Sequence, residues 1–337
     1  MRAAIFRGAG LPLAVEIVAD PVPGEGELVI RVERCGVCGT DLHMTSGHGD
    51  DVPLGTVIGH EFSGEIVAAG KDAGGFGTGE RVTAMPCRGC GVCARCREGY
   101  PIACTAMEGM VGGFGEYMRV AASSAISLPA GLSALDGALV EPLAVGLHGV
   151  RLAKMTPGSR VAVLGAGSIG LAVIYWARHL GAGCVVAMSR SARRAPLAND
   201  VGAQGFEAFG EGEGERLAAA LGGPPDILFE CTGAVGSMQK AVELVAPGGT
   251  IVSLGFCAAP DALVPALATW KRATMRFSFA YSLADFQESA DMLDAGHVEP
   301  RLMVSRTVGL DAFPAHFEAL RAGSGETKLH LDPWASA

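Results

Sequence analysis

Short stretches of alternating apolar and polar residues dominate the first 140 positions of the chain. Residues 27–33 alternate as a strand with one buried face should. Residues 62–69 and 81–84 show a similar pattern, and glycine and proline residues separate these stretches. We therefore predict that this part of the chain is mostly β-structure.

The pattern changes near Pro142, where strands and helices begin to alternate. Four apolar runs predict buried strands, at residues 161–164, 184–188, 227–230 and 250–254. Helical patterns are found at residues 143–153, 171–180 and 237–245. Strands that alternate with helices are typical of a parallel, doubly wound sheet, so the expected fold class is α/β.

Two further helical patterns, at residues 283–295 and 310–320, follow this region. We expect them to pack back on the first part of the chain. The predicted domains are therefore residues 1–142 with 279–337, and residues 143–278. A chain of 337 residues also favours two cores over one.

Composition and charge narrow the class of protein. The chain is 49% hydrophobic and 18% charged, as globular proteins are, and its net charge is −9. This charge argues against a general nucleic-acid or anionic membrane surface. We expect no membrane span, because no apolar run reaches about 18 residues. Residues 1–7 lack the apolar core of a signal peptide, so we expect a cytoplasmic protein.

Five of the ten cysteines lie between positions 87 and 104. Cys90, Cys93, Cys96 and Cys104 have the close spacing of a tetrahedral, structural zinc site, in a lobe of about residues 86–105. The even number of cysteines also allows disulfides, but CxxC spacing in a long chain without a secretion signal favours metal. We interpret Cys87 as a spare thiol.

A second set of metal ligands is dispersed along the first half of the chain. Cys35, His60, Glu61 and Glu141 are candidates for a catalytic zinc site that keeps one position open. We expect Asp41 to accept a hydrogen bond from the other ring nitrogen of His60 and to fix its tautomer. Each of these residues alone could have an ordinary structural role. The prediction of a zinc site therefore depends on all of them occurring together.

A glycine-rich turn follows the apolar strand at residues 161–164. Gly165, Gly167 and Gly170, with Ser168 and Ile169 between them, match the dinucleotide fingerprint at the start of a helix. The next strand ends at Ser189, where NAD-binding proteins usually carry an acidic residue, and Arg190 and Arg193 follow. We therefore favour NADP(H) over NAD(H), since an arginine pairs with a 2′-phosphate. The alternative is a solvated basic start of a helix.

These motifs together resemble the zinc-containing medium-chain alcohol dehydrogenase family over nearly the whole chain. The resemblance includes residues 35–43, Gly59-His60-Glu61, the four-cysteine lobe, residues 112–117 and Glu141-Pro142-Leu143-Ala144. The last of these is most similar to the branch that acts on polyols, threonine and secondary alcohols. The resemblance implies a GroES-like β domain and a Rossmann domain, two zinc ions per chain, and a homodimer or homotetramer.

The resemblance also implies a mechanism. Zinc polarises the oxygen of an alcohol or carbonyl substrate, Thr40 and His43 relay the proton to water, and hydride passes between the substrate and the nicotinamide. Glu61 and Glu141 are expected to exchange on the metal. We interpret Cys38, His48 and His148 as structural residues.

The leading hypothesis is an enzyme that interconverts a secondary alcohol, diol or polyol with its carbonyl form. Two alternatives are a quinone or enoyl reductase, which usually lacks the zinc ligands, and an NADPH-binding sensor without catalytic activity. The sequence does not identify the small-molecule substrate.

Overall fold

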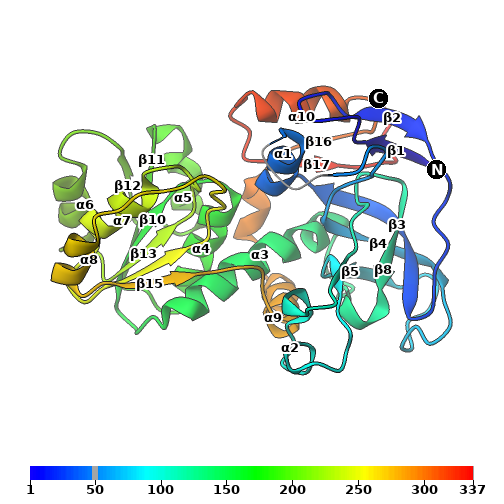
Figure 1. Ribbon diagram of the computed structural model, residues 1–337, viewed down its shortest axis with the longest axis horizontal. Coiled ribbons are helices and arrows are strands. Elements are labelled where there is room, and N and C mark those ends of the chain that lie inside the picture. Colours follow the sequence, from blue (N-terminus) through cyan, green and yellow to red (C-terminus); the bar gives the residue numbers. More distant parts are fainter. Residues whose placement is uncertain (48–51, 337) are drawn as a thin grey trace. The chain divides into compact units, whose positions relative to one another are not determined.

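The computed structural model describes residues 1–47 and 52–336, so His48 lies outside the described residues. The chain forms two compact units, Met1–Glu141 with Tyr281–Ala337, and Pro142–Ala280 (Figure 1). The boundaries differ from those that we expected by one residue at the first junction and by two at the second.

The first unit is built on a seven-stranded sheet of order β16-β17-β3-β4-β5-β9, in which β8 also pairs with β3. Its strands are β3 (Glu27–Gly36), β4 (Glu61–Ala69), β5 (Arg81–Ala84), β8 (Tyr117–Ala121), β9 (Ala125–Ser127), β16 (Val304–Val308) and β17 (Lys328–Leu331). Leu28, Ile30 and Val32 of β3 point into the core of this unit, as their alternation predicts.

The last strand, β17, pairs antiparallel with the end of β3, where His330 lies opposite Gly36 and Leu331 opposite Cys35. A segment near the end of the chain therefore lies beside the strand that leads into the cysteine-rich motif of residues 35–38.

Smaller elements complete the first unit. They are β1 (Arg2–Ile5), β2 (Ala14–Ile17), α1 (Gly39–Thr45), β6 (Cys87–Arg88), α2 (Ala94–Arg97), η1 (Pro101–Ala103), β7 (Glu108–Gly109), η2 (Ala122–Ser124), α9 (Leu283–Asp294), η4 (Glu299–Met303) and α10 (Phe313–Arg321). The helix α3 (Ala134–Ala153) begins in this unit and continues into the second.

The second unit contains a six-stranded sheet of order β12-β11-β10-β13-β14-β15, and all neighbouring strands are parallel. Its strands are β10 (Arg160–Leu164), β11 (Cys184–Ser189), β12 (Gly205–Ala208), β13 (Ile227–Glu230), β14 (Thr250–Ser253) and β15 (Thr274–Phe277). The prediction of a parallel, doubly wound α/β sheet is confirmed.

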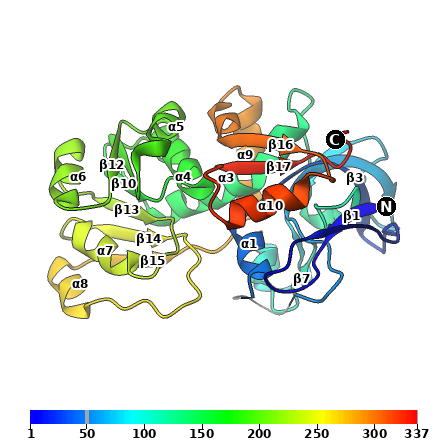
Figure 2. The ribbon, with the colours of Figure 1, turned by 90° about the horizontal axis from the view of Figure 1, so that it is seen from above.

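Helices cover both faces of this sheet. They are α4 (Ser168–His179), η3 (Ala192–Arg194), α5 (Ala195–Val201), α6 (Glu213–Leu221), α7 (Ser237–Leu244) and α8 (Pro265–Lys271). In Figure 2, α4 and α5 lie on one face and α7 and α8 on the other. This arrangement follows from right-handed crossovers that run outward from β10 in opposite directions. Ligands of such sheets bind at the carboxyl ends of the strands where the order reverses, here β10 and its neighbours.

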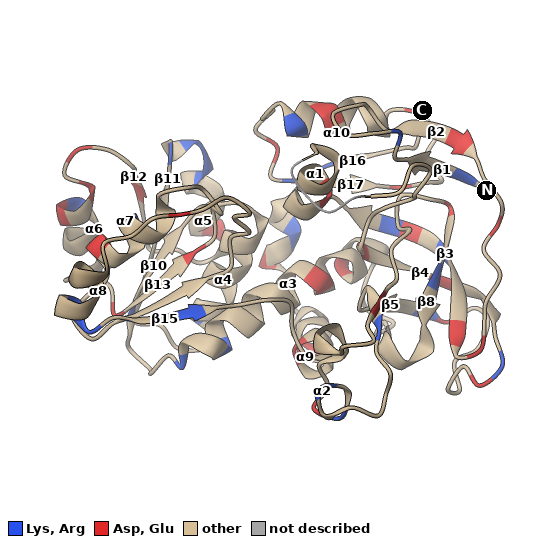
Figure 3. Ribbon diagram, viewed as in Figure 1, with Lys and Arg blue, Asp and Glu red and all other residues tan. Residues whose placement is uncertain are grey.

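Acidic and basic residues are interspersed over both units (Figure 3). None of the helices in the described part of the chain is long and apolar enough to cross a membrane.

Candidate metal centres and cofactor site

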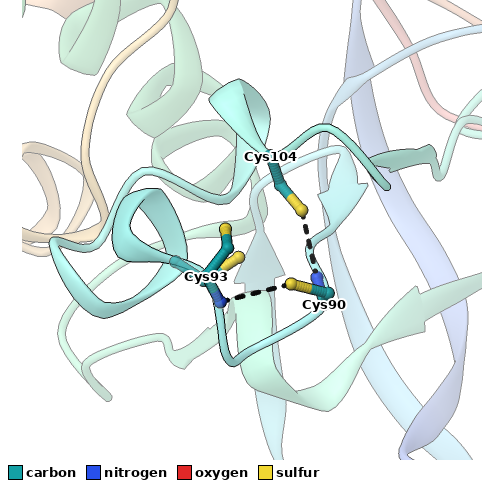
Figure 4. Close-up of side chains that lie close together, drawn as sticks. Cys90, Cys93 and Cys104 are labelled. Carbon is teal, nitrogen blue, oxygen red and sulfur yellow. Dashed lines mark hydrogen bonds between the residues drawn. The ribbon is translucent and has the colours of Figure 1, made fainter.

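The four cysteines of the lobe converge on one point. The sulfur atoms of Cys90, Cys93, Cys96 and Cys104 all lie within 4.8 Å of one another. Cys90 Sγ accepts a hydrogen bond from the Cys93 amide at 3.4 Å, and Cys104 Sγ accepts one from the Cys90 amide at 3.4 Å (Figure 4). Hydrogen bonds from the Val92 and Cys93 amides lower the pKa of Cys90 to about 6. Four clustered sulfurs, some with amide donors, fit a tetrahedral zinc ion.

Cys87 lies apart from these four sulfurs, on β6. It is fully buried, and its carbonyl accepts a hydrogen bond of 2.6 Å from Ser124 Oγ. Burial, followed by the effect of Cys104, raises the pKa of Cys87 to about 11. This environment suits a protonated core thiol, as we expected of a spare cysteine.

A second group of metal ligands forms where α1 and β4 begin. Atoms of Cys38, His60 and Glu61 lie within 4.8 Å of one another. Cys38 is the N-cap residue of α1, and its amide donates to Asp41 Oδ2 at 2.9 Å. The helix cap therefore fixes the backbone of Cys38 beside the first residues of β4. A thiolate, an imidazole and a carboxylate are suitable ligands for a catalytic zinc ion.

The structure does not bring Cys35 into this group, and we correct our expectation that it is the thiolate ligand. Cys35 is fully buried in the hydrophobic core of the first unit. A Cβ atom added to Gly113 would come within 2.4 Å of Cys35 Sγ, and one added to Gly59 within 3.0 Å. Cys35 is therefore a packed core residue, and Cys38, which we interpreted as structural, is the cysteine that lies beside His60 and Glu61.

The physical reason is a β-bulge in β3. The register of β3 against β4 shifts between Val32 and Arg34. An extra residue reverses the alternation of side chains along a strand. Cys35 therefore joins the buried face, and the next residue, Gly36, points to the other side. A Cβ atom on Gly36 would lie only 2.2 Å from Glu61 Oε2, so the close approach of Glu61 requires glycine there.

Asp41 makes the contact with His60 that we expected. Its Oδ1 lies 3.3 Å from His60 Nδ1, and Asp41 is almost fully buried. Burial opposes a charged imidazole, but the Asp41 carboxylate outweighs it and raises the pKa of His60 well above its ordinary value. Because Nδ1 faces Asp41, the Nε2 atom of His60 is available to a metal.

Lys328, on the terminal strand β17, is a site residue that the sequence analysis missed. Its Nζ lies 2.7 and 2.6 Å from the two carboxylate oxygens of Glu61 and donates to the Val37 carbonyl at 3.2 Å. Burial disfavours a charged lysine, but Glu61 outweighs it and raises the pKa of Lys328. The sequence signal that could have identified Lys328 is a lysine within an apolar run near the end of the chain.

Glu141, on α3, is also nearly buried but does not belong to the converging group of described ligands. Burial raises the pKa of Glu141 to about 7; His60 opposes this effect and Glu61 adds to it. These electrostatic effects place Glu141 near the group. The structure therefore offers two carboxylates at this centre, and only Glu61 is paired with a lysine.

The two predicted relay residues lie on α1. Thr40 Oγ1 is 3.6 Å from Cys38 Sγ, so its hydroxyl lies beside a proposed ligand. His43 follows three residues later, and residues with this spacing share one face of a helix.

A cavity of about 660 Å³ in the second unit is lined by four of the eight predicted cofactor residues. It lies at the carboxyl ends of β10, β11 and β13, and its lining includes Gly165, Gly167, Ser189, Arg190, Arg194, Thr232 and Lys240. Gly165 has a φ of +98°, and a Cβ atom on Gly170 would lie 1.8 Å from the Gly165 carbonyl oxygen. These two positions therefore need glycine, and the turn leads directly into α4.

The basic residues that line this cavity differ in part from the predicted Arg190 and Arg193. Arg194 lines it, whereas Arg193, Ser168, Ile169 and Gly170 are not among the lining residues. Arg194 Nη1 donates to the Ala166 carbonyl at 3.1 Å. Burial and then the neighbouring arginines lower the pKa of Arg194. Among the described residues, no carboxylate lines the cavity.

Family models match most of the chain. The alcohol dehydrogenase GroES-like domain matches residues 24–130, and the zinc-binding dehydrogenase domain matches residues 168–295.

Individual proteins are similar over almost the full length. A sorbitol dehydrogenase of Halalkalibacterium halodurans is 29% identical over 95% of each chain. A structure of a zinc-binding dehydrogenase from Sinorhizobium meliloti 1021, bound to NADP, is 32% identical, with a TM-score of 0.88 and coverage of 98% of this chain and 99% of the other. An alcohol dehydrogenase structure from Escherichia coli CFT073, complexed with NADH, is 26% identical, with a TM-score of 0.89 and the same coverage.

Proposed function

Because the chain belongs to the zinc-containing medium-chain dehydrogenase family, we propose that it oxidises a polyol or another secondary alcohol to its carbonyl form with NADP⁺. The observation that carries the proposal is the convergence of Cys38, His60 and Glu61, with Asp41 behind His60. The alcohol loses a hydride to the nicotinamide and a proton to water, so the products are a ketone or aldehyde, NADPH and H⁺. The polyol assignment is supported by the similarity to a sorbitol dehydrogenase.

We propose Cys38, His60 and Glu61 as ligands of the catalytic zinc, with Glu141 as the carboxylate that approaches it during the reaction. A zinc ion bound here would polarise the substrate oxygen and stabilise negative charge on it. Lys328 balances the charge of Glu61 in the buried site. The quinone or enoyl reductase alternative is disfavoured, because it leaves this converging ligand set without a purpose.

The proton path that we propose begins at the Thr40 hydroxyl, which lies beside Cys38, and continues to His43. Thr40 is exposed, so its hydroxyl has access to water, and His43, which is half-buried, lies three residues further along α1. A hydroxyl can accept one proton while it donates another, which suits Thr40 to this role.

We propose NADP(H) as the preferred cofactor. Arg190, Arg194 and Lys240 line the cavity of the second unit, and Ser189 occupies the position where a carboxylate would select the ribose 2′-hydroxyl of NAD. Arg190 and Arg194, with no acidic residue in the lining, favour an additional phosphate group, whereas Lys240 already forms an ion pair with Glu213. The related structures with NADP and with NADH show that the family uses both cofactors, so this choice depends on the residues of the chain itself.

We also propose a homodimer that forms through β15, the edge strand of the six-stranded sheet. Phe277 on this strand is 73% exposed, and Trp270 on the preceding helix α8 is 85% exposed. An open edge with large exposed apolar side chains favours pairing with a second copy.

The cysteines of the described chain are all unpaired. This state suits the reducing cytoplasm.

The activity is tested by mixing the zinc-loaded protein with NADP⁺ or NAD⁺ and a panel of polyols, diols, secondary alcohols and aromatic alcohols. The absorbance of the reduced nicotinamide is followed. We expect turnover of one class of polyol or secondary alcohol, and faster turnover with NADP⁺. No turnover of any alcohol, together with no oxidation of NADPH by the corresponding ketones and aldehydes, would contradict the proposed function and support the sensor alternative.

A further inference from the structure

Tyr281 is a buried tyrosine that the motifs of the chain do not explain. It begins the second segment of the first unit, immediately before Ser282, the N-cap residue of α9. Only 1% of Tyr281 is exposed, and its ring stacks on Phe286 with centroids 5.5 Å apart and an interplanar angle of 14°. The ring is therefore fixed by packing, and its hydroxyl is removed from water.

The hydroxyl of Tyr281 faces the catalytic carboxylates. Burial, and next the Glu141 carboxylate, raise the pKa of Tyr281 well above its ordinary value; Cys87 and Glu61 add to this effect. A hydrogen-bonding contact with Glu141 also raises the pKa of Tyr281, but this contact is short of full hydrogen-bond geometry among the described residues. A buried hydroxyl without a partner is costly, so the orientation toward Glu141 calls for an explanation. A phenol that keeps its proton is a donor for a carboxylate close to it.

The two glutamates at this centre have different surroundings. Glu61 is held through both of its oxygens by Lys328. No lysine or arginine of the described chain forms an ion pair with Glu141, and Tyr281 is the neutral donor that faces it. Glu61 is therefore held by an ion pair, whereas the hydrogen-bond donor that faces Glu141 is the Tyr281 hydroxyl.

The backbone next to Tyr281 is anchored to the four-cysteine lobe. The Leu283 amide donates to the Gly99 carbonyl at 2.9 Å, and Gly99 lies between Cys96 and Cys104 in the chain. Ser282 is fixed by a capping box with Asp285, in which the Asp285 amide donates to Ser282 Oγ at 3.1 Å. The loop that carries Tyr281 is thus held by the lobe on one side and by α9 on the other.

We propose that Tyr281 is a positioning residue: its hydroxyl donates a hydrogen bond to Glu141 when that carboxylate approaches the Cys38–His60–Glu61 group, and the four-cysteine lobe holds Tyr281 in place through Leu283 and Gly99. This inference rests on the proposed catalytic centre. It assigns the lobe a second role, because loss of the structural metal would release the loop that orients Glu141.

The test uses the full-length protein with cobalt in place of zinc, because the visible spectrum of cobalt reports the ligand geometry without turnover. Tyr281→Phe removes only the hydroxyl, and Tyr117→Phe on β8 is the matched control. The Tyr117 ring packs on Trp334 with centroids 5.6 Å apart. We expect Tyr281→Phe to shift the cobalt bands of the catalytic site and to lower kcat about tenfold, the loss typical of a hydrogen bond to a charged group. Cofactor affinity and the thermal midpoint should stay close to those of Tyr117→Phe.

A second variant tests the link to the lobe. Leu283 is the first residue of α9, a position that tolerates proline because its amide has no partner within the helix. Ser282, which precedes it, is already extended, with φ of −88° and ψ of 162°. Leu283→Pro should therefore preserve α9, remove the bond to Gly99 and shift the same cobalt bands.

The outcomes separate this inference from the proposed function. Cobalt bands and kcat of Tyr281→Phe that equal those of the control would overturn the role of the hydroxyl. Unchanged bands in Leu283→Pro would overturn the link to the lobe. If the wild-type protein turned over no substrate, the proposed function would fail, but the spectra would still decide whether Tyr281 orients Glu141.

Discussion

Lys328 Nζ lies 2.6 Å from Glu61 Oε2 at the edge of the Cys38–His60–Glu61 group, and the two side chains are 1% and 0% exposed. Two opposite charges removed from water depend on each other, because either alone would be buried without compensation. The pair joins β17, near the end of the chain, to the first residue of β4. The last strand therefore contributes directly to the electrostatics of the proposed metal centre.

Replacing Lys328 with methionine should destabilise the first unit by about 3–5 kcal/mol, because the Glu61 carboxylate would be left buried and unpaired. Urea unfolding measures this change. Lys71→Met is the control, since the side chain of Lys71 is 81% exposed and should contribute little. Equal stability of the two variants would show that the buried pair does not form.

Cys38→Ser should abolish turnover, whereas Cys35→Ala should mainly lower the stability of the protein. Cys38→Ser removes the proposed thiolate ligand, so turnover should fall below detection while NADPH still binds to the second unit. Cys35→Ala removes a packed sulfur from the core, so it should cost about 1–2 kcal/mol of stability and leave most of the activity. Steady-state kinetics with both variants distinguishes them. If Cys35→Ala were inactive and Cys38→Ser active, the assignment from the structure would be wrong.

Arg190→Ala should weaken NADPH binding about tenfold to a hundredfold and leave NADH binding nearly unchanged, because it removes a charge-assisted hydrogen bond to the 2′-phosphate. Arg193→Ala is the matched control, since Arg193 does not line the cavity. Fluorescence titration with both reduced cofactors gives the dissociation constants. Equal losses for NADH and NADPH would contradict the assignment of Arg190.

Cys104→Ser should remove the structural metal and lower the thermal midpoint, because the lobe has few buried residues of its own to hold α2 and η1 together. Cys87→Ser is the control, because this thiol lies outside the sulfur cluster, and it should retain the metal. Calorimetry and elemental analysis follow the two effects. Loss of metal from Cys87→Ser alone would mean that the ligand set has been assigned incorrectly.

Phe277→Lys should convert the proposed homodimer to a monomer, since it places a charge on the open edge strand β15. Leu11→Lys is a control at an apolar side chain of the first unit that is 53% exposed. Sedimentation velocity measures the mass of each variant. A wild-type protein that sediments as a monomer would remove the basis for this interface.

The pattern of residues along the chain was sufficient to predict a mostly β first part and a parallel, doubly wound sheet in the second, whereas the GroES-like fold was implied by the family resemblance. Two local signals carried this prediction: the alternation of apolar and polar residues in residues 27–33, and the apolar runs in the second half of the chain. The structure confirms the strands that these signals predict. The spacing of Cys90, Cys93, Cys96 and Cys104 was also sufficient, because these residues lie within one short loop region.

Features that depend on register or on distant segments could not be predicted in this way. The bulge between Val32 and Arg34 places Cys35 on the buried face of β3, and no residue pattern marks this bulge. Lys328 reaches Glu61 only because β17 pairs with β3. The Lys328–Val37 hydrogen bond beside this pairing joins residues that are 291 positions apart in the chain. The sequence likewise did not show that Arg194 rather than Arg193 lines the cofactor cavity.

The zinc content of the wild-type protein and of Cys38→Ser, measured by elemental analysis, tests the central claim most directly. The account predicts about two zinc ions per chain in the wild-type protein and about one in Cys38→Ser, because the four-cysteine site remains intact. Two ions in both proteins would show that Cys38 is not required to hold the second metal and would contradict the proposed catalytic centre.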